Sequence, residues 1–212
     1  MLYLLENTDY LDEIFLTKAR PFLSQQRCQK MDHYKNISDR INAAAVFLLL
    51  RYALLHEYHI NECPDFVLGE YGKPFLKDLP QIHFSFSHCR NAAVCIVSDE
   101  NTAADISDIR RISPATVRRV CSEEEIRHLS NCNDKNTYSR EFFRLWTQKE
   151  CLSKLCGKGL SMDFRTLGSH SPAFSSVKTI EKERYILSYY ARFTDFEPVV
   201  FDSPETIWNG IG

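Results

Sequence analysis

The sequence lacks the features of several specialised protein classes. Glycine and proline are scarce, at 7 and 8 of 212 residues, which excludes collagen-like, low-complexity and flexible linker segments. Neither sign of charge is in excess, because 26 Lys and Arg residues face 28 Asp and Glu residues. A net charge of −2 provides no broad positive field for nucleic acid or an anionic membrane, so we expect neither as a partner.

Long apolar runs are missing as well. The longest, residues 43–50, ends at Arg51 and is too short to cross a bilayer. Residues 1–15 are interrupted by four acidic residues, whereas a signal peptide needs a basic start and an unbroken apolar stretch. We therefore expect a protein of the cytoplasm.

The eight cysteines show no pattern of a metal site or a disulfide framework. None belongs to a C-x-x-C pair, and no Cys/His spacing is typical of zinc. Without an export signal, we expect reduced thiols that pack mostly as small apolar side chains.

Regular elements are predicted mainly from hydrophobic patterning. A helix capped by Ser38 is predicted over residues 38–58, and we expect it to be buried because residues 43–50 are apolar on nearly all sides. A second long helix is predicted over residues 137–156, ending at Gly157. The remaining predicted elements are strands over 82–86, 92–97, 103–109 and 185–193, and short helices opened by Ser113 and Ser122.

The order of these elements, a helix and strands followed by helices and a strand, predicts an α+β protein. It divides the chain into two α+β halves, residues 1–100 and 101–212, that pack as one unit. No sequence repeat, low-complexity segment or flexible linker separates the halves, which implies a rigid cleft between them.

The helix over residues 137–156 carries the most informative side chains. Trp146, Glu150 and Lys154 are four residues apart and therefore lie on one face of the helix. Taken alone, a Glu–Lys pair at this spacing is more often a surface ion pair, and a tryptophan is more often a core residue. An acid beside a base is also what is needed to hold a magnesium ion against a phosphate.

Other polar residues lie at places where they are equally ambiguous when taken singly. Asp105 is a carboxylate within an apolar strand, where a charge is usually paired, metal-bound or at an edge facing water. Ser87 and His88 directly follow a predicted strand, where they can bind phosphate or cap a turn. Lys73 lies in a Gly-Lys-Pro turn, and Arg40 lies near the start of a helix, where an anion can bind.

The order and spacing of these motifs decide the interpretation. The chain contains, in this order, Gly72-Lys73-Pro74, Phe86-Ser87-His88, Asp105-Ile106 and Trp146-Thr147-x-Lys149-Glu150-x-x-x-Lys154-x-x-Gly157-x-Gly159-Leu160. This series resembles the 4′-phosphopantetheinyl transferase family, and most closely its long, single-chain type that activates surfactin synthetase. The resemblance extends from about Arg27 to Leu160, and the last motif is the specific one.

The resemblance implies both a fold and an activity. The implied fold is a pseudo-dimer of two similar α+β halves, monomeric, with coenzyme A in the cleft between them. The implied activity is the Mg²⁺-dependent transfer of 4′-phosphopantetheine from coenzyme A to a serine of an apo acyl or peptidyl carrier protein. Adenosine 3′,5′-bisphosphate is the other product.

The resemblance also implies roles for individual residues. Asp105 and Glu150 match the metal-binding acids, and Glu150 is also the proposed base for the carrier serine, with a metal-bound water as the alternative. Lys154 matches the lysine that contacts the phosphate under attack. The implied coenzyme-binding residues are Tyr71, Gly72 and Lys73 at the adenine end, Ser87 and His88 at the phosphates, and Arg40 near the 3′-phosphate, with Arg27 and Lys30 in a region where the family has further basic residues.

One position departs from the family pattern. The long type reads Gly-x-Asp-x-Glu at the strand acid, with both acids on the metal, whereas residues 103–107 here place Ser107 at the second position. Serine is a weak, neutral ligand for Mg²⁺. Asp108 matches an acid of the short, trimeric type but is expected on the opposite face of the strand from Asp105.

Two alternatives to an active transferase follow from the sequence. Ser107 supports a catalytically impaired coenzyme A-binding module of the same fold, although the retained Glu150 and Lys154 oppose it. An interaction protein with a merely solvated charged helix is the third hypothesis. If the chain is a transferase, residues 117–136 are expected to influence which carrier it modifies, and Arg118, Arg119 and Arg127 are candidates to meet an acidic carrier.

Overall fold

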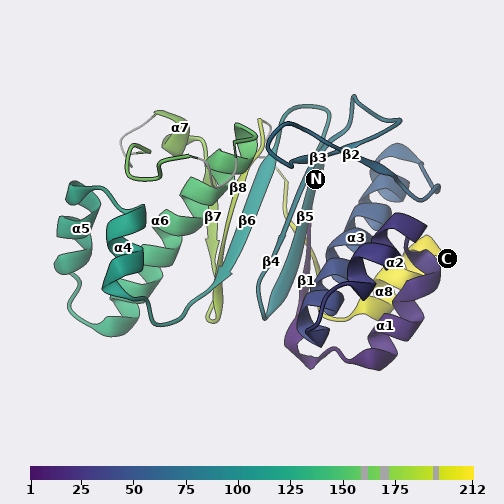
Figure 1. Ribbon diagram of the computed structural model, residues 1–212, viewed down its shortest axis with the longest axis horizontal. Helices are drawn as coiled ribbons and strands as arrows, with labels where there is room; N and C mark the ends of the chain where they lie inside the picture. Colours follow the sequence, from purple (N-terminus) through teal and green to yellow (C-terminus); the bar gives the residue numbers. More distant parts are fainter. Residues whose placement is uncertain (159–161, 168–171, 193–195) are drawn as a thin grey trace.

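The computed structural model of the protein describes residues 1–158, 162–167, 172–192 and 196–212 (Figure 1). Its strands are β1 (Leu2–Glu6), β2 (Phe66–Leu68), β3 (Pro74–Leu76), β4 (His83–His88), β5 (Ala92–Ser98), β6 (Ala103–Asp108), β7 (Lys178–Glu181), β8 (Tyr185–Tyr190) and β9 (Val199–Phe201). Its helices are α1 (Glu13–Ala19), α2 (Gln25–Asp32), α3 (Ile37–Tyr58), α4 (Pro114–Val120), α5 (Glu123–Ser130), α6 (Lys135–Leu155), α7 (Pro172–Ser175) and α8 (Pro204–Ile211), with 3₁₀ turns at Thr8–Tyr10 and Arg20–Phe22. The predicted α+β class is confirmed.

The first half of the chain builds a sheet with the strand order β4-β5-β1-β9, covered by α3. The apolar run at residues 43–50 of α3 is buried, as predicted, because this helix lies between the sheet on one side and α1, α2 and α8 on the other (Figure 1). The helix begins at Ile37 with Asn36 at its N-cap, so the prediction that Ser38 caps it is wrong.

The second half repeats the combination of a long helix and an antiparallel sheet. The strand order is β6-β8-β7, and α6 lies across β6 and β8. The short helices α4 and α5 lie on the far side of α6 from this sheet (Figure 1). Whether the two halves are related as a pseudo-dimer remains a prediction.

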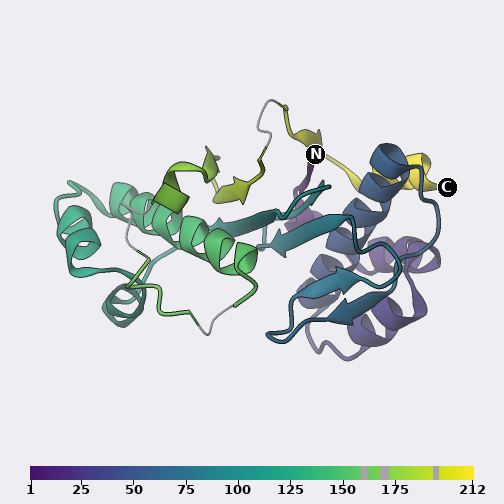
Figure 2. The ribbon, with the colours of Figure 1, turned by 90° about the horizontal axis from the view of Figure 1, so that it is seen from above.

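The two sheets meet where β4 runs beside β6, between the long helices α3 and α6 (Figure 2). The hydroxyl of Ser85 on β4 accepts a hydrogen bond from the backbone N–H of Ala104 on β6 at 3.2 Å. One apolar cluster is shared by both sheets and contains Leu2, Leu4, Val94, Ile96, Ala104, Ile106 and Leu187. The halves are therefore joined by a common core.

The end of the chain returns to the first half. Strand β9 pairs in parallel with β1, with Val200 beside Leu4, and α8 packs on α3. The division at residue 100 stays a prediction, and this return is a connection that the sequence did not indicate. The eight cysteines are all free. Among the described residues, no helix has the length and apolar character needed to span a bilayer.

The contact of α8 with α3 depends on a glycine. A Cβ atom at Gly210 would lie 2.4 Å from Cε2 of Tyr52 and 3.2 Å from Nε2 of His56. Tyr52 cannot move aside easily, because its ring is stacked on His56 at 4.0 Å and packs edge-on against Phe201 at 5.0 Å.

We therefore predict that Gly210→Ala lowers the free energy of unfolding by about 1–3 kcal/mol, because the added methyl group overpacks this contact. Urea denaturation of both proteins measures the difference. Asn209→Ala, at the exposed neighbouring position, is the control and should change stability by no more than about 0.5 kcal/mol. Equal stability of Gly210→Ala and the parent protein would contradict the close approach.

Candidate active site

Asp105 lies at the place where β4, β6 and α6 meet. Its side chain is buried, and Oδ1 accepts hydrogen bonds from Oγ of Ser87 at 2.8 Å and from Nζ of Lys154 at 2.7 Å. Its other oxygen, Oδ2, is buried and has no hydrogen-bond partner among the described residues. An unpartnered buried carboxylate oxygen is costly, so it marks a position that a cation or a donor would stabilise.

Helix α6 supplies the groups opposite Asp105. Asp134 caps its first turn by accepting from the backbone N–H groups of residues 136 and 137, and the chain leaves the helix through Gly157 with a φ of +71°. The ammonium of Lys154 also donates to the carbonyl of Ala104 at 3.0 Å. The helix is thereby fixed against β6 by its last turn.

Glu150 lies one turn before Lys154 and is also buried. Burial and the negative charge of Asp105 raise the pKa of Glu150 from its ordinary value of 4.5 to about 7, and the charge of Lys154 opposes this shift. The two carboxylates are therefore close enough to repel one another. A divalent cation between them would remove this repulsion.

The oxygen ligands that these residues offer fit Mg²⁺. Asp105 and Glu150 supply two carboxylates, and Ser107 lies on the same face of β6 as Asp105, with no hydrogen bond to its hydroxyl in the part of the chain that the structure describes. No group of three or more His, Cys, Asp or Glu side chains suited to a metal occurs among the described residues. Mg²⁺ accepts such a site, because it usually combines one or two carboxylates with waters and phosphate oxygens.

Asp108 has a structural role on the other face of β6. Its carboxylate accepts hydrogen bonds from the backbone N–H of Arg90, at 2.8 Å, and from the side-chain amide of Asn91. It therefore holds the turn between β4 and β5, away from Asp105, as expected from the alternation of the strand.

Tyr71, Gly72 and Lys73 share a cavity of about 200 Å³ with Lys154 and Gly157. Gly72 adopts a φ of +80°, which allows the chain to turn between β2 and β3. The structure thus brings the predicted adenine-end residues to the same cavity as the predicted phosphate-binding lysine.

Asn101, which the sequence interpretation missed, contacts Lys73 of this cavity. Its Oδ1 accepts a hydrogen bond from Nζ of Lys73 at 3.2 Å, and its Nδ2 donates to the carbonyl of Leu155 at 2.9 Å. It therefore ties the β2–β3 turn to the end of α6. Burial lowers the pKa of Lys73.

Ser87 and His88 belong to β4 itself, so their expected position after the strand is wrong by two residues. Ser87 holds Asp105, as described. The pKa of His88 is lowered, first by the surrounding protein and then by the charge of Lys154. The carboxylates of Asp39 and Asp105 offset only part of this shift. The structure thus places Ser87 against Asp105, whereas His88 is exposed and makes no hydrogen bond to Asp105, Glu150 or Lys154 among the described residues.

The upstream basic residues lie on two helices, Arg40 on α3 and both Arg27 and Lys30 on α2. The Nε of Arg40 donates to the carbonyl of Tyr34 at 2.9 Å, and no hydrogen bond or ion pair links Arg40 to Ser87, His88 or Lys154 among the described residues. The buried guanidinium of Arg27 lies over the rings of Phe47, Phe66 and Phe86 at 5.2–5.6 Å, and burial lowers its pKa to about 10. Burial and the charge of Arg27 lower the pKa of Lys30.

A larger cavity, of about 670 Å³, lies over Glu150. Its floor is Trp146 and Glu150 on α6. One wall comes from α4 (Ala115, Thr116, Arg119 and Val120) and the other from residues 162–165. Glu150 and Lys154 therefore face two different cavities, one turn of helix apart. Gly159 and Leu160 of the sequence motif lie outside the described residues.

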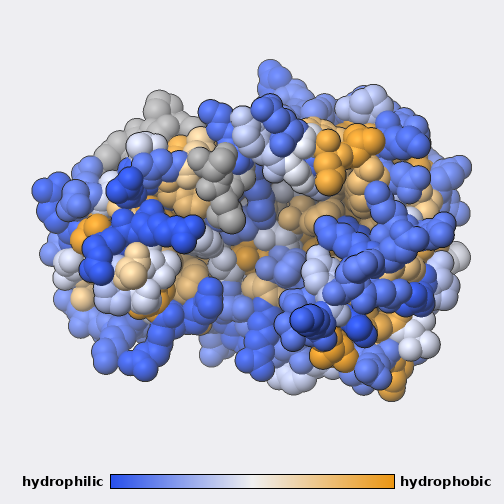
Figure 3. All heavy atoms as spheres, viewed as in Figure 1, coloured by the Kyte–Doolittle hydropathy of each residue, from blue (hydrophilic) through white to orange (hydrophobic). Residues whose placement is uncertain are grey.

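The face of the molecule seen in Figure 3 is largely polar. The β2–β3 hairpin is an exception, because Val67, Leu68 and Phe75 are exposed.

We predict that Glu150→Gln makes the metal-free protein more resistant to heat near pH 8. A carboxyl group whose pKa is raised on folding destabilises the folded state increasingly as the pH rises from about 4.5 to about 7, with the full cost above that range. Melting curves in a chelator should show a higher Tm for Glu150→Gln at about pH 8 and equal values at about pH 4. A lower Tm for the variant at about pH 8 would contradict the raised pKa of Glu150.

Comparison with known proteins agrees with this geometry. A sequence model of the 4′-phosphopantetheinyl transferase superfamily matches residues 100–200. The 4′-phosphopantetheinyl transferase Sfp of Bacillus subtilis is 28% identical over 192 residues, which cover 82% of this chain and 84% of the relative. The 4′-phosphopantetheinyl transferase gsp of Aneurinibacillus migulanus is 33% identical over 139 residues, 65% of this chain and 57% of the relative. A third relative, the L-aminoadipate-semialdehyde dehydrogenase-phosphopantetheinyl transferase of Candida glabrata, is 29% identical over 155 residues, 69% of this chain and 58% of the relative. The chain belongs to the 4′-phosphopantetheinyl transferase superfamily.

Proposed function

We propose that the protein transfers the 4′-phosphopantetheine group of coenzyme A to a serine hydroxyl of an apo acyl or peptidyl carrier protein, with Mg²⁺, and releases adenosine 3′,5′-bisphosphate. The observation that carries the proposal is the cluster of Asp105, Glu150 and Lys154, which lies between two cavities in a chain similar to named phosphopantetheinyl transferases. The cavity that contains Lys73 suits the donor substrate, coenzyme A, and is called the donor cavity. The cavity over Glu150 suits the acceptor, the serine of the carrier, and is called the acceptor cavity.

Asp105 and Glu150 would hold the Mg²⁺ ion, which supplies positive charge to the pyrophosphate oxygens when it is bound. The unpartnered Oδ2 of Asp105 and the repulsion between the two acids support this assignment. The hydroxyl of Ser107 or a water would take the place of a third acidic ligand.

Lys154 stabilises negative charge on the phosphate under attack. Its ammonium is already held at the mouth of the donor cavity by Asp105 and Ala104, so little reorganisation is needed during the reaction. His88 and Ser87 would lie near the same phosphates, and Lys73 near the nucleotide end. The donor substrate is thus bound by side chains from both halves of the chain.

Glu150 faces the acceptor cavity and is the candidate to take the proton of the carrier serine. A carboxylate whose pKa is near 7 is a better base than an ordinary glutamate, and a metal-bound carboxylate is a poorer one. A water relaying the proton to Glu150 is therefore the alternative. We also propose a monomer that acts in the cytoplasm.

Mass spectrometry of the carrier tests the proposal. The protein is incubated with coenzyme A, Mg²⁺ and apo carriers of the fatty-acid, polyketide and peptide-synthetase types. We expect the carrier to gain a phosphopantetheine group, and a carrier whose acceptor serine is replaced by alanine to gain none. If no carrier gains mass although coenzyme A with Mg²⁺ raises the Tm, the second candidate, a catalytically impaired coenzyme A-binding module, is favoured through Ser107. Absence of both effects would contradict any coenzyme A-binding function.

Lys154→Ala should reduce the transfer rate by about 10²–10³-fold, because it removes the cation that faces the reacting phosphate. Mg²⁺ binding, followed by calorimetry, should be equal or tighter in this variant, since the ammonium competes for the carboxylate of Asp105. Transfer at the parent rate by a folded Lys154→Ala protein would rule out this role.

Ser107→Glu should tighten Mg²⁺ binding by about tenfold, equal to about 1.4 kcal/mol, because it adds a third carboxylate to the face of β6 that carries Asp105. Asp108→Asn, on the opposite face, is the control and should leave the Kd for Mg²⁺ unchanged. Weaker binding by Ser107→Glu would mean that position 107 does not face the metal.

A further inference from the structure

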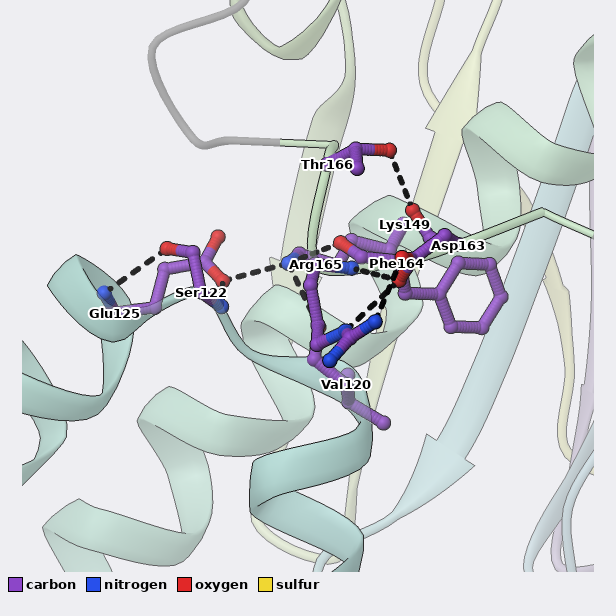
Figure 4. Close-up of polar contacts among 8 residues, drawn as sticks. All are labelled: Val120, Ser122, Glu125, Lys149, Asp163, Phe164, Arg165 and Thr166. Carbon is purple, nitrogen blue, oxygen red and sulfur yellow. Dashed lines mark hydrogen bonds and ion pairs between the residues drawn. The ribbon is translucent and has the colours of Figure 1, made fainter.

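Lys149, the residue before Glu150, is a fully buried cation with a complete set of partners. Its ammonium donates to Oε2 of Glu125 at 2.6 Å, to the carbonyl of Phe164 at 2.8 Å and to the carbonyl of Val120 at 3.0 Å (Figure 4). These bonds use all three donors of the group. The position of the ammonium is thereby fixed in three directions.

The three partners come from three different segments. Val120 ends α4, and Glu125 lies in the first turn of α5, where it forms a capping box with Ser122. Phe164 belongs to residues 162–167. Val120 and Phe164 both line the cavity over Glu150, the first at the end of α4 and the second within residues 162–165, so one ammonium on α6 anchors both segments.

The wall that contains Phe164 is a tight turn. Thr166 Oγ1 donates to the carbonyl of Asp163 at 2.7 Å, and the carboxylate of Asp163 pairs with the guanidinium of Arg165 at 2.9 Å (Figure 4). These contacts are all within the turn, and two contacts of Phe164 attach it to α6: its carbonyl accepts from Lys149, and its ring packs edge-on against Trp146 at 5.8 Å. Of these two, the hydrogen bond is the directed one and fixes the backbone of the turn. Displacing that carbonyl would move Arg165, which lines the cavity.

Stability does not explain why the chain keeps this pair. Burying two charges costs free energy that their attraction only partly offsets, and apolar residues of similar volume often replace such a pair without loss of stability. Here the cost is increased, because Oε1 of Glu125 is buried and has no hydrogen-bond partner among the described residues. What an apolar pair could not reproduce is the directed attachment of two backbone carbonyls.

We infer that Lys149, with Glu125, is a positioning residue for the acceptor: it sets the separation of the two walls through which the carrier serine reaches Glu150. This inference rests on the proposed function. The donor cavity is lined by other residues, among them Lys73 and Gly157, and Lys149 is not one of them. Loss of the pair should therefore affect the carrier and not coenzyme A.

Steady-state kinetics of the double variant Lys149→Met/Glu125→Gln tests this role. The two changes remove both charges at similar side-chain volume, and the amide introduced at position 125 keeps an oxygen for the backbone N–H of Ser122. We expect the KM for the carrier to rise at least about tenfold while the KM for coenzyme A changes less than about twofold. A merely structural role would lower the active fraction and leave both KM values unchanged, and that result in a folded variant would overturn the inference.

Arg144→Gln is the matched control. It removes an ion pair of 2.7 Å with Glu141 on the same helix, at residues that do not line the cavity over Glu150. Both KM values should stay within about twofold of those of the parent protein. A carrier KM raised as much as in the double variant would show that any ion pair on α6 has this effect, and would overturn the specific role of Lys149.

Amide hydrogen exchange separates this inference from the proposed function, because it needs no transfer. In the double variant, amides of residues 120–125 and 162–167 should exchange at least about tenfold faster, with those of α3 unchanged. Unchanged exchange in either wall would overturn the inference even if transfer occurs. Conversely, failure of the parent protein to modify any carrier contradicts the proposed function alone.

If the double variant does not fold, Lys149→Arg, which keeps the charge, takes its place with the same measurements. The larger, planar guanidinium group should shift the segments that contain Val120 and Phe164, and should raise the carrier KM by more than about twofold. A carrier KM equal to that of the parent protein would overturn the inference. Failure of both variants to fold would make the pair a requirement of the fold as a whole, and would overturn it as well.

Discussion

The ion pair between Asp105 and Lys154 is the interaction on which the site depends. A buried carboxylate needs a counter-charge, and this one is supplied from a helix that lies across the strand. Ser87 adds a hydrogen bond from the neighbouring sheet, so three elements are fixed relative to one another at a single carboxylate. The same contact leaves one oxygen of Asp105 without a partner among the described residues and keeps Glu150 near a second negative charge. The arrangement therefore brings the halves together around a carboxylate that a cation would stabilise.

The sequence predicted the elements that carry strong patterns. Helices α3 and α6 and strands β5 and β6 have long apolar or periodic runs, and each was placed within a few residues. Strands β2, β3 and β9 have three residues each, too few for a period to appear. Strand β1 is apolar but pairs with segments about 90 and 200 residues away, and such pairing leaves no local signal.

The candidate site residues were predicted from the order and spacing of motifs. Asp105, Glu150 and Lys154 came from motif spacing, and the structure brings them together. Arg40 was predicted by the same reasoning but makes its hydrogen bond with Tyr34. Lys149 was part of the motif and received no role, because its partner Glu125 is 24 residues away in the sequence. Contacts across such separations depend on tertiary packing, which the spacing of one motif does not contain.

The parallel pairing of β9 with β1 has a consequence for synthesis of the protein on the ribosome. The strand that completes the first sheet follows β1 by almost 200 residues, so the edge of β1 stays uncovered until that much more of the chain has been translated. An uncovered edge offers free backbone groups to other chains. Nascent or prematurely terminated chains without residues 199–211 should therefore be the forms that depend most on chaperones.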